Sequence, residues 1–438
     1  MWHEAAGNRA LVMGLGRFGG GLGVTRFLAQ RGWSVLVTDL APEAELAGPL
    51  AELGDLSVAY RLGEHCAADF AAADLVVVNP AVNPQQNRYV QAAREAGATL
   101  TSEIRLLIDH LPGGARDRVL GVTGTAGKST VTAMLGSALE TIAGQDARVW
   151  VGGNLGGSLL PQVDEIGQAD WVVLELSSFM LAGLDEPGWS PATAVVTNIA
   201  PNHLDWHGSF EAYQAAKRVI LRHQQPGDRA VLGPGVTDWP TNAGIERIAV
   251  EQPFAGELAL PGEHNRWNAA LAQAALTANG FDPTATANAL SRFAGLAHRL
   301  ELVAERDGWR AFNDSKATTP EAAMRALHSF APGQAHLILG GYDKGSDLTE
   351  LAQAAAGHAA AVYTIGDTGP AIAEAARAGG GNAPVHACGD LDSAVQEARQ
   401  RIEPGQVLLL SPGCASWDQF TNFETRGERF RACLTPAP

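Results

Sequence analysis

Short apolar runs recur along the whole chain, and most of them end in glycine or in polar residues. The runs that we interpret as buried strands cover residues 10–16, 33–38, 75–78, 98–100, 119–122, 147–151, 171–176, 194–199, 309–313, 336–339, 362–365 and 407–410. Segments with apolar residues at helical spacing follow many of these runs, for example at 23–31, 131–139 and 210–223. Strands that alternate with helices are typical of α/β domains built on mostly parallel sheets.

Turn-rich segments divide this pattern into three parts. The segment 111–117, LPGGARD, is polar and rich in turn residues, and we interpret it as the first linker. A third run of alternating strands and helices begins near residue 296. We therefore expect an α/β protein with a Rossmann-like N-terminal domain at 1–112, a central P-loop ATPase domain with a mostly parallel sheet at 113–295, and a Rossmann-like C-terminal domain at 296–438.

The most informative turn is GVTGTAGKST at 121–130, which follows one apolar run and precedes a helical pattern. The backbone N–H groups of such a turn, together with the positive end of the helix, favour a bound polyphosphate. Lys128 would reach the β- and γ-phosphates, and Ser129 or Thr130 would hold Mg²⁺. Counted from the first glycine, five residues precede Gly127, which is one more than in the standard P-loop.

A second glycine turn lies near the N-terminus and has the spacing GxGxxG. Gly14, Gly16 and Gly19 follow an apolar run, and Asp39 ends the next run. In Rossmann domains such a turn binds a diphosphate and the acidic residue binds a ribose hydroxyl. The layout suits any nucleotide diphosphate, although a glycine turn also serves strand–helix packing alone.

Polar side chains follow several strands, at the edge of a parallel sheet where ligands bind. Asn79, Glu175 and His203 each stand at or just past the end of an apolar run. Glu175 suits Mg²⁺ or its water shell, although a glutamate at a strand end is also satisfied by solvent. Lys217 lies in the amphipathic pattern at 210–223, and this pattern alone predicts that its side chain faces solvent.

Charge and composition narrow the classes of partner. The formal net charge is −16 over 438 residues, which argues against nucleic acid or an anionic membrane as the main partner. The four cysteines lack metal-ligand spacing, so we expect reduced thiols. No apolar run has bilayer length, and the first residues lack the pattern of a signal peptide. We therefore expect a cytoplasmic protein with no integral membrane segment, and we expect a monomer.

Taken together, the motifs resemble those of the Mur ligases, ATP-dependent amino-acid ligases of peptidoglycan precursor synthesis. The resemblance covers nearly the whole chain and rests on GVTGTAGKST at 121–130, GGNLG at 152–156, ELSSF at 175–179, NIAPNHLDWHG at 198–208, YQAAK at 213–217, GEHNRWNA at 262–269, HRLE at 298–301, NDSKAT at 313–318, LGGYDKG at 339–345 and SPGCASWDQFTNFETRG at 411–427. The third-domain segments resemble the branch that adds D-glutamate. The Asp-Asn-Pro-Arg motif of the branch that adds a diamino acid is absent from the sequence.

The resemblance implies that ATP activates the carboxylate of UDP-N-acetylmuramoyl-L-alanine as an acyl phosphate, which the amine of D-glutamate then attacks. It implies a catalytic set of Lys128, Glu175, His203 and Lys217. It implies two Mg²⁺ sites supported by Ser129, Glu175, His203 and Lys217, the last as a carbamate formed from CO₂.

The resemblance also assigns three groups of binding residues. Those implied for ATP are Gly124, Thr125, Ala126, Gly127, Lys128, Ser129, Thr130, Asn265, Asn268, Arg299 and Asp314. Those implied for the UDP substrate are Gly16, Arg17, Phe18, Asp39, Asn79, Asn154 and His203. Those implied for D-glutamate are His298, Lys316, Thr318, Lys344, Ser416 and Phe423.

The chain departs from the family pattern at two places. Asn202 stands where an acid usually precedes the histidine, which leaves one negative charge fewer near the second metal site. The glycine run at 19–23 is longer than usual, so the sequence does not determine the residues that contact uridine.

Three other interpretations of the protein's function are an NAD-dependent oxidoreductase built on the N-terminal turn, a ligase like folylpolyglutamate synthetase, and an inactive scaffold protein. The oxidoreductase leaves the phosphate turn unexplained, the folylpolyglutamate branch lacks such a first domain, and the intact Lys128, Glu175, His203 and Lys217 oppose a scaffold.

Overall fold

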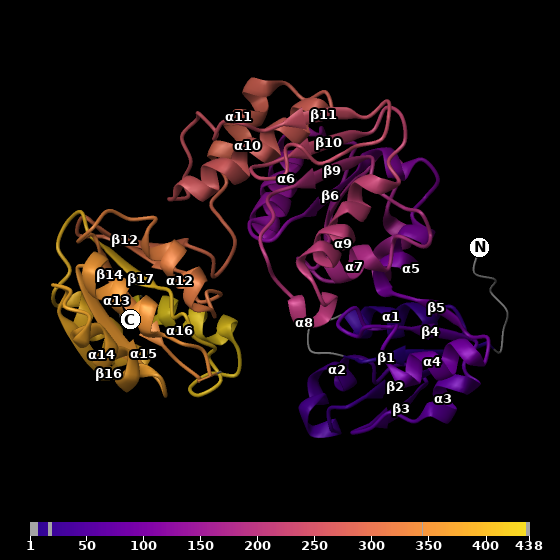
Figure 1. Cartoon of the computed structure of the whole chain (residues 1–438), viewed down its shortest axis with the longest axis horizontal. Helices are drawn as coiled ribbons and strands as arrows, with labels where there is room; N and C mark the ends of the chain where they lie inside the picture. The colour runs from indigo at the N-terminus through magenta and orange to yellow at the C-terminus, as the bar shows by residue number, and fades with distance from the viewer. Residues whose placement is uncertain (1–7, 16–19, 344, 435–438) are drawn as a thin grey trace. The chain divides into compact units, whose positions relative to one another are not determined.

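The computed structural model describes residues 8–15, 20–343 and 345–434, which form parts of two compact units. The first unit spans Met1–Phe254 and Trp267–Ala289, and the second spans Ala255–Arg266 and Leu290–Pro438. Two sheets lie in the first unit and one lies in the second (Figure 1). The expected fold class, α/β with mostly parallel sheets in three successive regions, is confirmed. The expected boundaries at 112 and 295 stay predictions.

The N-terminal sheet has five parallel strands in the order β3-β2-β1-β4-β5. The strands are β1 (Arg9–Met13), β2 (Ser34–Asp39), β3 (Val58–Leu62), β4 (Leu75–Val77) and β5 (Thr99–Thr101). The helices are α1 (Gly20–Gln30), α2 (Ala47–Glu52), α3 (Ala67–Ala72), α4 (Arg88–Glu95) and α5 (Glu103–His110). The strand order reverses between β1 and β4, and open α/β sheets bind ligands at such a switch point.

The central sheet has six parallel strands in the order β11-β10-β9-β6-β8-β7. The strands are β6 (Val119–Thr123), β7 (Val149–Gly153), β8 (Trp171–Glu175), β9 (Thr193–Val196), β10 (Arg229–Leu232) and β11 (Glu246–Ala249). The helices are α6 (Lys128–Ile142), α7 (Ser178–Ala182), α8 (Leu204–His207), α9 (Phe210–Arg222), α10 (Glu263–Ala278) and α11 (Pro283–Ser291). Strand β6 pairs with β8 and β9, so the carboxyl ends of these three strands lie side by side.

The two sheets of the first unit share one hydrophobic core. Phe27 and Leu107 of the N-terminal region belong to the same buried cluster as Leu160 and Leu181 of the central region. Polar contacts join the same surfaces, because the Ser158 hydroxyl donates to the Glu103 carboxylate at 2.5 Å. The N-terminal and central sheets are therefore parts of one continuous packed structure.

The sheet of the second unit has six strands in the order β12-β13-β17-β14-β15-β16. The strands are β12 (Glu301–Arg306), β13 (Trp309–Asn313), β14 (Ala335–Gly340), β15 (Ala361–Ile365), β16 (Val385–Gly389) and β17 (Val407–Leu410). The helices are α12 (Pro320–Leu327), α13 (Thr349–His358), α14 (Gly369–Ala378), α15 (Leu391–Arg399) and α16 (Phe423–Leu434). The β12–β13 pair is antiparallel and the other pairs are parallel.

Most strands that the apolar runs did not predict lie at sheet edges, and the exception is β10, which lies between β9 and β11. Strands β3, β12 and β16 each form one edge of a sheet, and most of their residues are half-buried or exposed. An edge strand of this kind lacks the continuous apolar run of a strand that is buried on both faces. Helix α1 begins at Gly20, earlier than the expected start at Gly23.

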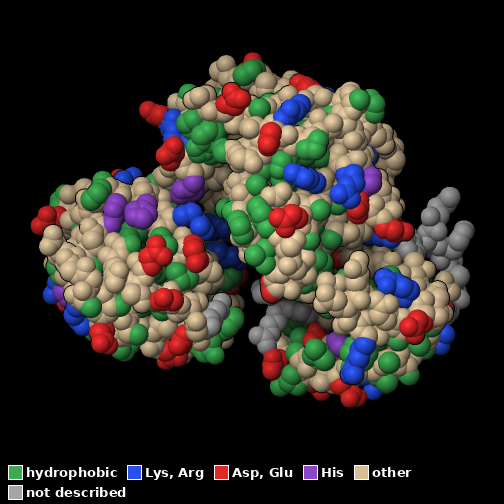
Figure 2. Space-filling model, in the orientation of Figure 1, with side chains coloured by type: hydrophobic (Ala, Val, Ile, Leu, Met, Phe, Trp, Pro, Cys, Tyr) green, Lys and Arg blue, Asp and Glu red, His purple; other side chains and the backbone are tan. Residues whose placement is uncertain are grey.

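The surface and the thiols agree with the composition. On the face shown in Figure 2, acidic side chains are spread over both units, as the net charge of −16 leads one to expect. All four cysteines are free thiols. Among the helices in the described part of the chain, none combines the length and apolar composition that a membrane-spanning helix needs.

Candidate active site

The loop between β6 and α6 is held tightly on both sides, as a phosphate-binding turn requires. A Cβ atom on Gly124 would lie 1.9 Å from the Thr197 hydroxyl oxygen, and one on Gly127 would lie 2.4 Å from the Asn268 side-chain oxygen. Both glycines also have positive φ angles, +146° and +83°. The Asn198 side chain accepts a hydrogen bond from Ala126 N at 3.0 Å. The motif did not indicate Thr197 and Asn198, which follow β9 and fix the loop.

Lys128 is the first residue of α6 and folds back over this loop. Its Nζ donates to the carbonyl oxygens of Gly124 at 3.0 Å and Thr125 at 3.1 Å. Ser129 is buried beside it, and Thr130 is half-buried. The loop therefore brings together all seven predicted ATP residues from Gly124 to Thr130, at the N-terminus of a helix of 15 residues.

Glu175 ends β8 and offers one free carboxylate oxygen in a buried position. Its side chain is 1% exposed, and its Oε1 accepts a hydrogen bond from Asn154 Nδ2 at 2.9 Å. Its Oε2 is buried with no hydrogen-bond partner among the described residues. A buried carboxylate oxygen without a partner is costly unless a cation satisfies it. Asn154, which the resemblance assigned to the UDP substrate, contacts Glu175 in this structure.

These residues fit a Mg²⁺ ion that is shared with a phosphate chain. Among the described residues there is no cluster of three or more His, Cys, Asp or Glu side chains that could hold a metal by itself. Mg²⁺ commonly keeps several waters and takes one or two protein oxygens together with substrate phosphates. The Glu175 carboxylate and the Ser129 hydroxyl supply such oxygens next to the loop.

Lys217 lies on α9 and is 2% exposed, so the expectation that it faces solvent is wrong. Its Nζ donates to Gly124 O at 2.7 Å and to Thr123 Oγ1 at 3.3 Å, and it lies 4.8 Å from the centre of the Tyr213 ring. Burial, assisted by the nearby Lys128 charge, lowers the pKa of Lys217 to about 6. Tyr213 stands four residues before Lys217, and this spacing indicates that the two share the buried helix face.

His203 stands before α8 with a left-handed backbone, φ 52°. Its ring centre lies 4.9 Å from that of Phe179. Partial burial, and then the positive charge of Lys128, lower the pKa of His203 against the opposing effect of Asp205. A lowered pKa favours the neutral imidazole that binds metals. Asn202 accepts a hydrogen bond from His203 N at 2.9 Å.

Two of the residues predicted for the UDP substrate surround the turn that follows β1. The Asp39 carboxylate accepts hydrogen bonds from Leu15 N and Ala41 N, both at 2.9 Å. The side chain of Asn79 lies against Gly14 and accepts a hydrogen bond from Ala81 N at 2.9 Å. Asp39 therefore shapes the turn itself. Three further residues predicted for this substrate, Gly16, Arg17 and Phe18, lie outside the described residues.

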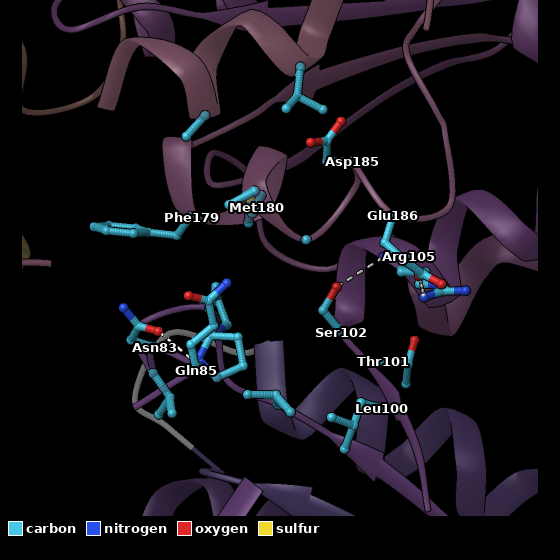
Figure 3. A pocket seen from close by; sticks show the side chains of 18 of the residues that line it. Asn83, Gln85, Leu100, Thr101, Ser102, Arg105, Phe179, Met180, Asp185 and Glu186 are labelled. Atoms are coloured by element: carbon cyan, nitrogen blue, oxygen red, sulfur yellow. Dashed lines mark hydrogen bonds and ion pairs between the residues drawn. The ribbon is translucent and has the colours of Figure 1, made fainter. Parts of the chain in front are cut away.

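A pocket of about 780 Å³ lies between the loop after β4 and helices α7 to α9, all within the first unit. Figure 3 shows Asn83 and Gln85 on one side of it and Phe179 and Met180 on the other. The indole nitrogen of Trp206 donates to Ala81 O at 3.1 Å, and Asn83 donates to Trp206 O at 3.4 Å. These contacts join the loop after β4 to α8, the helix that His203 precedes. Among the described residues predicted for the UDP substrate, only Asn79 lines the pocket.

Of the residues predicted for D-glutamate, Lys316, Thr318 and Ser416 follow the carboxyl ends of β13 and β17 in the second unit, His298 precedes β12, and Phe423 begins α16. The Lys316 ammonium lies 3.9 Å from the centre of the Phe423 ring, and Ser416 is buried nearby in the loop after β17. His298 is buried and accepts a hydrogen bond from Asn313 Nδ2 at 2.9 Å. Thr318 N donates to Lys316 O at 2.9 Å. Lys344 lies outside the described residues.

Three residues predicted for ATP also belong to the second unit. Asn265 donates to Pro261 O at 2.7 Å. Asp314 accepts hydrogen bonds from the Ser411 hydroxyl at 2.7 Å and from Leu300 N at 3.2 Å. Burial raises the pKa of Asp314 to about 7, against the opposing effect of these bonds and of Arg299. The residues predicted for ATP are thus distributed over both units.

Comparisons with known proteins identify the protein family to which the chain belongs. Three family models match in order: the Mur ligase MurD-like N-terminal domain at 8–102, the Mur ligase middle domain at 122–238, and the Mur ligase glutamate ligase domain at 298–414. The chain belongs to the Mur ligase family. The full-length matches do not favour the oxidoreductase or the folylpolyglutamate synthetase alternative.

Individual relatives agree with this family. The chain is 42% identical to a protein of Roseiflexus sp. and 38% identical to one of Pelotomaculum thermopropionicum, and both relatives are named UDP-N-acetylmuramoylalanine–D-glutamate ligase. These matches cover 98% of both chains in the first case, and 97% of this chain and 96% of the relative in the second. The solved structure of UDP-N-acetylmuramate-alanine ligase MurC from Thermotoga maritima shares the fold, with a TM-score of 0.59 at 20% identity over 96% of this chain and 98% of that chain.

Proposed function

We propose that the protein joins D-glutamate to UDP-N-acetylmuramoyl-L-alanine at the expense of ATP, a reaction of peptidoglycan precursor synthesis. The observation that supports the ATP-dependent step is the buried Oε2 of Glu175, which has no hydrogen-bond partner among the described residues. Glu175 ends β8, the strand that pairs with β6. The choice of D-glutamate rests on the relatives of the same length that are named for this reaction.

The chemistry follows from the charges of the reactants. An oxygen of the substrate carboxylate attacks the γ-phosphorus of ATP, so that ADP leaves and an acyl phosphate forms. The amine of D-glutamate then attacks the acyl carbon, loses a proton, and the C–O bond to phosphate breaks. ATP, the UDP substrate and D-glutamate all carry negative charge, so the site must supply positive charge. Lys128 supplies such a charge at the phosphate loop, where its ammonium lies within hydrogen-bond distance of Gly124 O and Thr125 O.

Mg²⁺, when bound, neutralises phosphate charge and helps to align the γ-phosphorus with the attacking oxygen. Ser129 and Glu175 are the residues that would hold the ion on the ATP phosphates, and Asn154 orients the Glu175 carboxylate. His203 would hold a second ion, and the lowered pKa of its imidazole favours the neutral form that this role needs.

We also propose that the neutral amine of Lys217 adds to the carbon of CO₂ and loses one proton to solvent, which gives a carbamate. The neutral amine is the reactive form, and a pKa of about 6 makes the Lys217 amine neutral at pH 7. Its nitrogen is fixed against Gly124 O, directly behind the phosphate loop. A carbamate there adds a negative charge that orients or binds Mg²⁺.

On the amino-acid side, Lys316 is the residue whose charge suits a carboxylate of D-glutamate. It is exposed and lies against the Phe423 ring, and Thr318 and the buried Ser416 belong to the same loops. Lys344 is the second lysine that the resemblance assigns to this substrate. A cytoplasmic location and a monomeric state also stay predictions.

A phosphate-release assay tests the proposed function. The purified protein is mixed with ATP, Mg²⁺ and UDP-N-acetylmuramoyl-L-alanine, and each amino acid of a panel is added in turn. We expect sustained release with D-glutamate and background release with L-glutamate, D-aspartate or no amino acid. Lys128→Ala serves as the control for contaminating ATPases. Release with another amino acid and none with D-glutamate contradicts the proposed substrate.

A further inference from the structure

Arg426 is an arginine in the interior of the second unit. It lies on α16 and is 1% exposed, the largest fully buried side chain of the described residues. Its Nε donates to the Ser315 hydroxyl at 2.9 Å, and its Nη2 donates to Ser315 O at 2.9 Å and to Cys414 O at 3.1 Å. Its Nη1 donates to Ala415 O at 3.1 Å. The guanidinium thus contacts two separate loops at once.

Each of these loops carries residues assigned above to D-glutamate. Ser315 precedes Lys316 in the loop after β13, and Ala415 precedes Ser416 in the loop after β17. The same Ser315 hydroxyl donates to Phe423 O at 2.8 Å, which adds the first residue of α16. One guanidinium, directly or through Ser315, therefore sets the spacing of the three segments that carry Lys316, Ser416 and Phe423.

The charge of Arg426 is as unusual as its position. All four of its hydrogen-bond acceptors are backbone carbonyls or a hydroxyl, and none is a carboxylate. Burial lowers its pKa to about 10, against smaller opposing effects of Cys414 and Asp418, so the group stays protonated at neutral pH. Buried charges are normally paired, because an unpaired charge loses its hydration. D-glutamate carries two carboxylates, and its binding places negative charge in the same group of loops.

We propose that Arg426 is a positioning residue of the amino-acid site, holding the loops of Lys316 and Ser416 in register and favouring a dicarboxylate through its buried charge. The proposal rests on the proposed function. It explains why the long basic side chain of Arg426 is buried at the carboxyl edge of a sheet, where close packing alone would favour an apolar side chain. Lysine does not substitute for it, because an ammonium cannot reproduce a planar fork that reaches both loops.

The test compares Arg426→Lys and Arg426→Met with Arg429→Met. Arg429 lies on the same helix, but it is exposed and paired with Asp392. Steady-state kinetics give the KM for D-glutamate, ATP and the UDP substrate. We expect the KM for D-glutamate to rise about tenfold in Arg426→Lys and further in Arg426→Met, since hydrogen bonds to a charged group are lost. The other two KM values and the Arg429 variant should stay within about twofold of the wild type.

A second variant keeps the test decisive if Arg426→Met does not fold. Ser315→Ala removes only the hydroxyl between Arg426 and Phe423 O, and it should raise the KM for D-glutamate in the same selective way. An unchanged KM for D-glutamate in both Arg426→Lys and Ser315→Ala overturns the proposal. So does an equal rise of all three KM values, because a merely structural role predicts it. A wild-type protein that does not use D-glutamate overturns the proposed function itself, so the two failures are distinguishable.

Discussion

The Nζ of Lys217 donates a hydrogen bond of 2.7 Å to the backbone carbonyl of Gly124, the glycine whose Cβ would collide with Thr197. This contact joins the middle of α9 to the phosphate loop. It places an amine of lowered pKa directly behind the residues that we expect to hold the ATP phosphates. The chemistry of Lys217 and the shape of the loop are therefore linked.

The first prediction concerns Lys217 itself. Lys217→Ala should lose at least about 99% of the activity, because it removes both the bond to Gly124 O and the carbamate. Short-chain carboxylates should restore part of the activity, since they replace the carbamate anion. Phosphate release with and without added acetate or formate measures this. Glu211→Ala, an exposed change on the same helix, is the control. A fully active Lys217→Ala protein means that the carbamate proposal is wrong.

The second prediction concerns the pair Asn154 and Glu175. Asn154→Ala removes the hydrogen bond that orients the Glu175 carboxylate. The Mg²⁺ concentration for half-maximal activity should rise about tenfold, the usual cost of losing a residue that orients a metal ligand. Titration of Mg²⁺ at saturating ATP measures this shift. If the Mg²⁺ requirement stays unchanged and only the KM for the UDP substrate rises, Asn154 acts on the substrate, as the family resemblance implied.

The third prediction concerns the link between the loop after β4 and α8. Trp206→Phe keeps an aromatic ring but removes the hydrogen bond to Ala81 O. We expect the KM for the UDP substrate to rise about fivefold, the effect of one hydrogen bond. Trp150→Phe is a matched control, because it also removes one indole hydrogen bond, the one to Asp170. Equal effects of the two variants would show that the loop contact has no special role in substrate binding.

The apolar pattern predicts most inner strands and misses several edge strands, among them β3, β12 and β16. Strands β13 and β17 match their expected bounds, because both pair on two sides in their sheet and most of their residues are buried. Strand β3 pairs on one side only and consists of exposed and half-buried residues, so no continuous apolar run marks it. An apolar run in the sequence indicates that a strand is buried on both faces. An edge strand is less buried, so its sequence lacks such a run.

The site shows the same limit at the level of single side chains. Spacing alone placed Lys128 and Ser129 correctly at the start of α6, because a strand, a glycine turn and a helix are consecutive in the sequence. It placed Lys217 in solvent, because the loop that buries it is 93 residues away in the chain. Arg426 was missed for the same reason, since its partner Ser315 is 111 residues away. Contacts between segments that are distant in the sequence form only in the folded protein, so the local pattern of apolar and polar residues does not predict them.

The fourth prediction uses the pKa of Asp314. Burial raises this pKa from 3.8 to about 7, so Asp314 contributes stability below pH 4 that is lost as the pH rises through 7. Asp314→Asn stays neutral throughout. The melting temperature of the variant relative to the wild type should therefore rise by roughly 5 °C between pH 5 and pH 8.

Asp392 is the matched control for this pH dependence. The hydrogen bond from Arg429 lowers the pKa of Asp392, so it is ionised at both pH values. The effect of Asp392→Asn on the melting temperature should be the same at pH 5 and pH 8. A constant difference for Asp314→Asn as well would show that Asp314 is ionised in the folded protein at pH 5.

Identification of the product tests the central proposal most directly. The protein is incubated with UDP-N-acetylmuramoyl-L-alanine, ATP, Mg²⁺ and either D- or L-glutamate, and the nucleotide products are analysed by chromatography and mass spectrometry. We predict a product heavier than the UDP substrate by one glutamyl residue, formed with D-glutamate only and accompanied by one ADP per molecule. No such product with D-glutamate, together with a product from another amino acid or from none, would contradict the account.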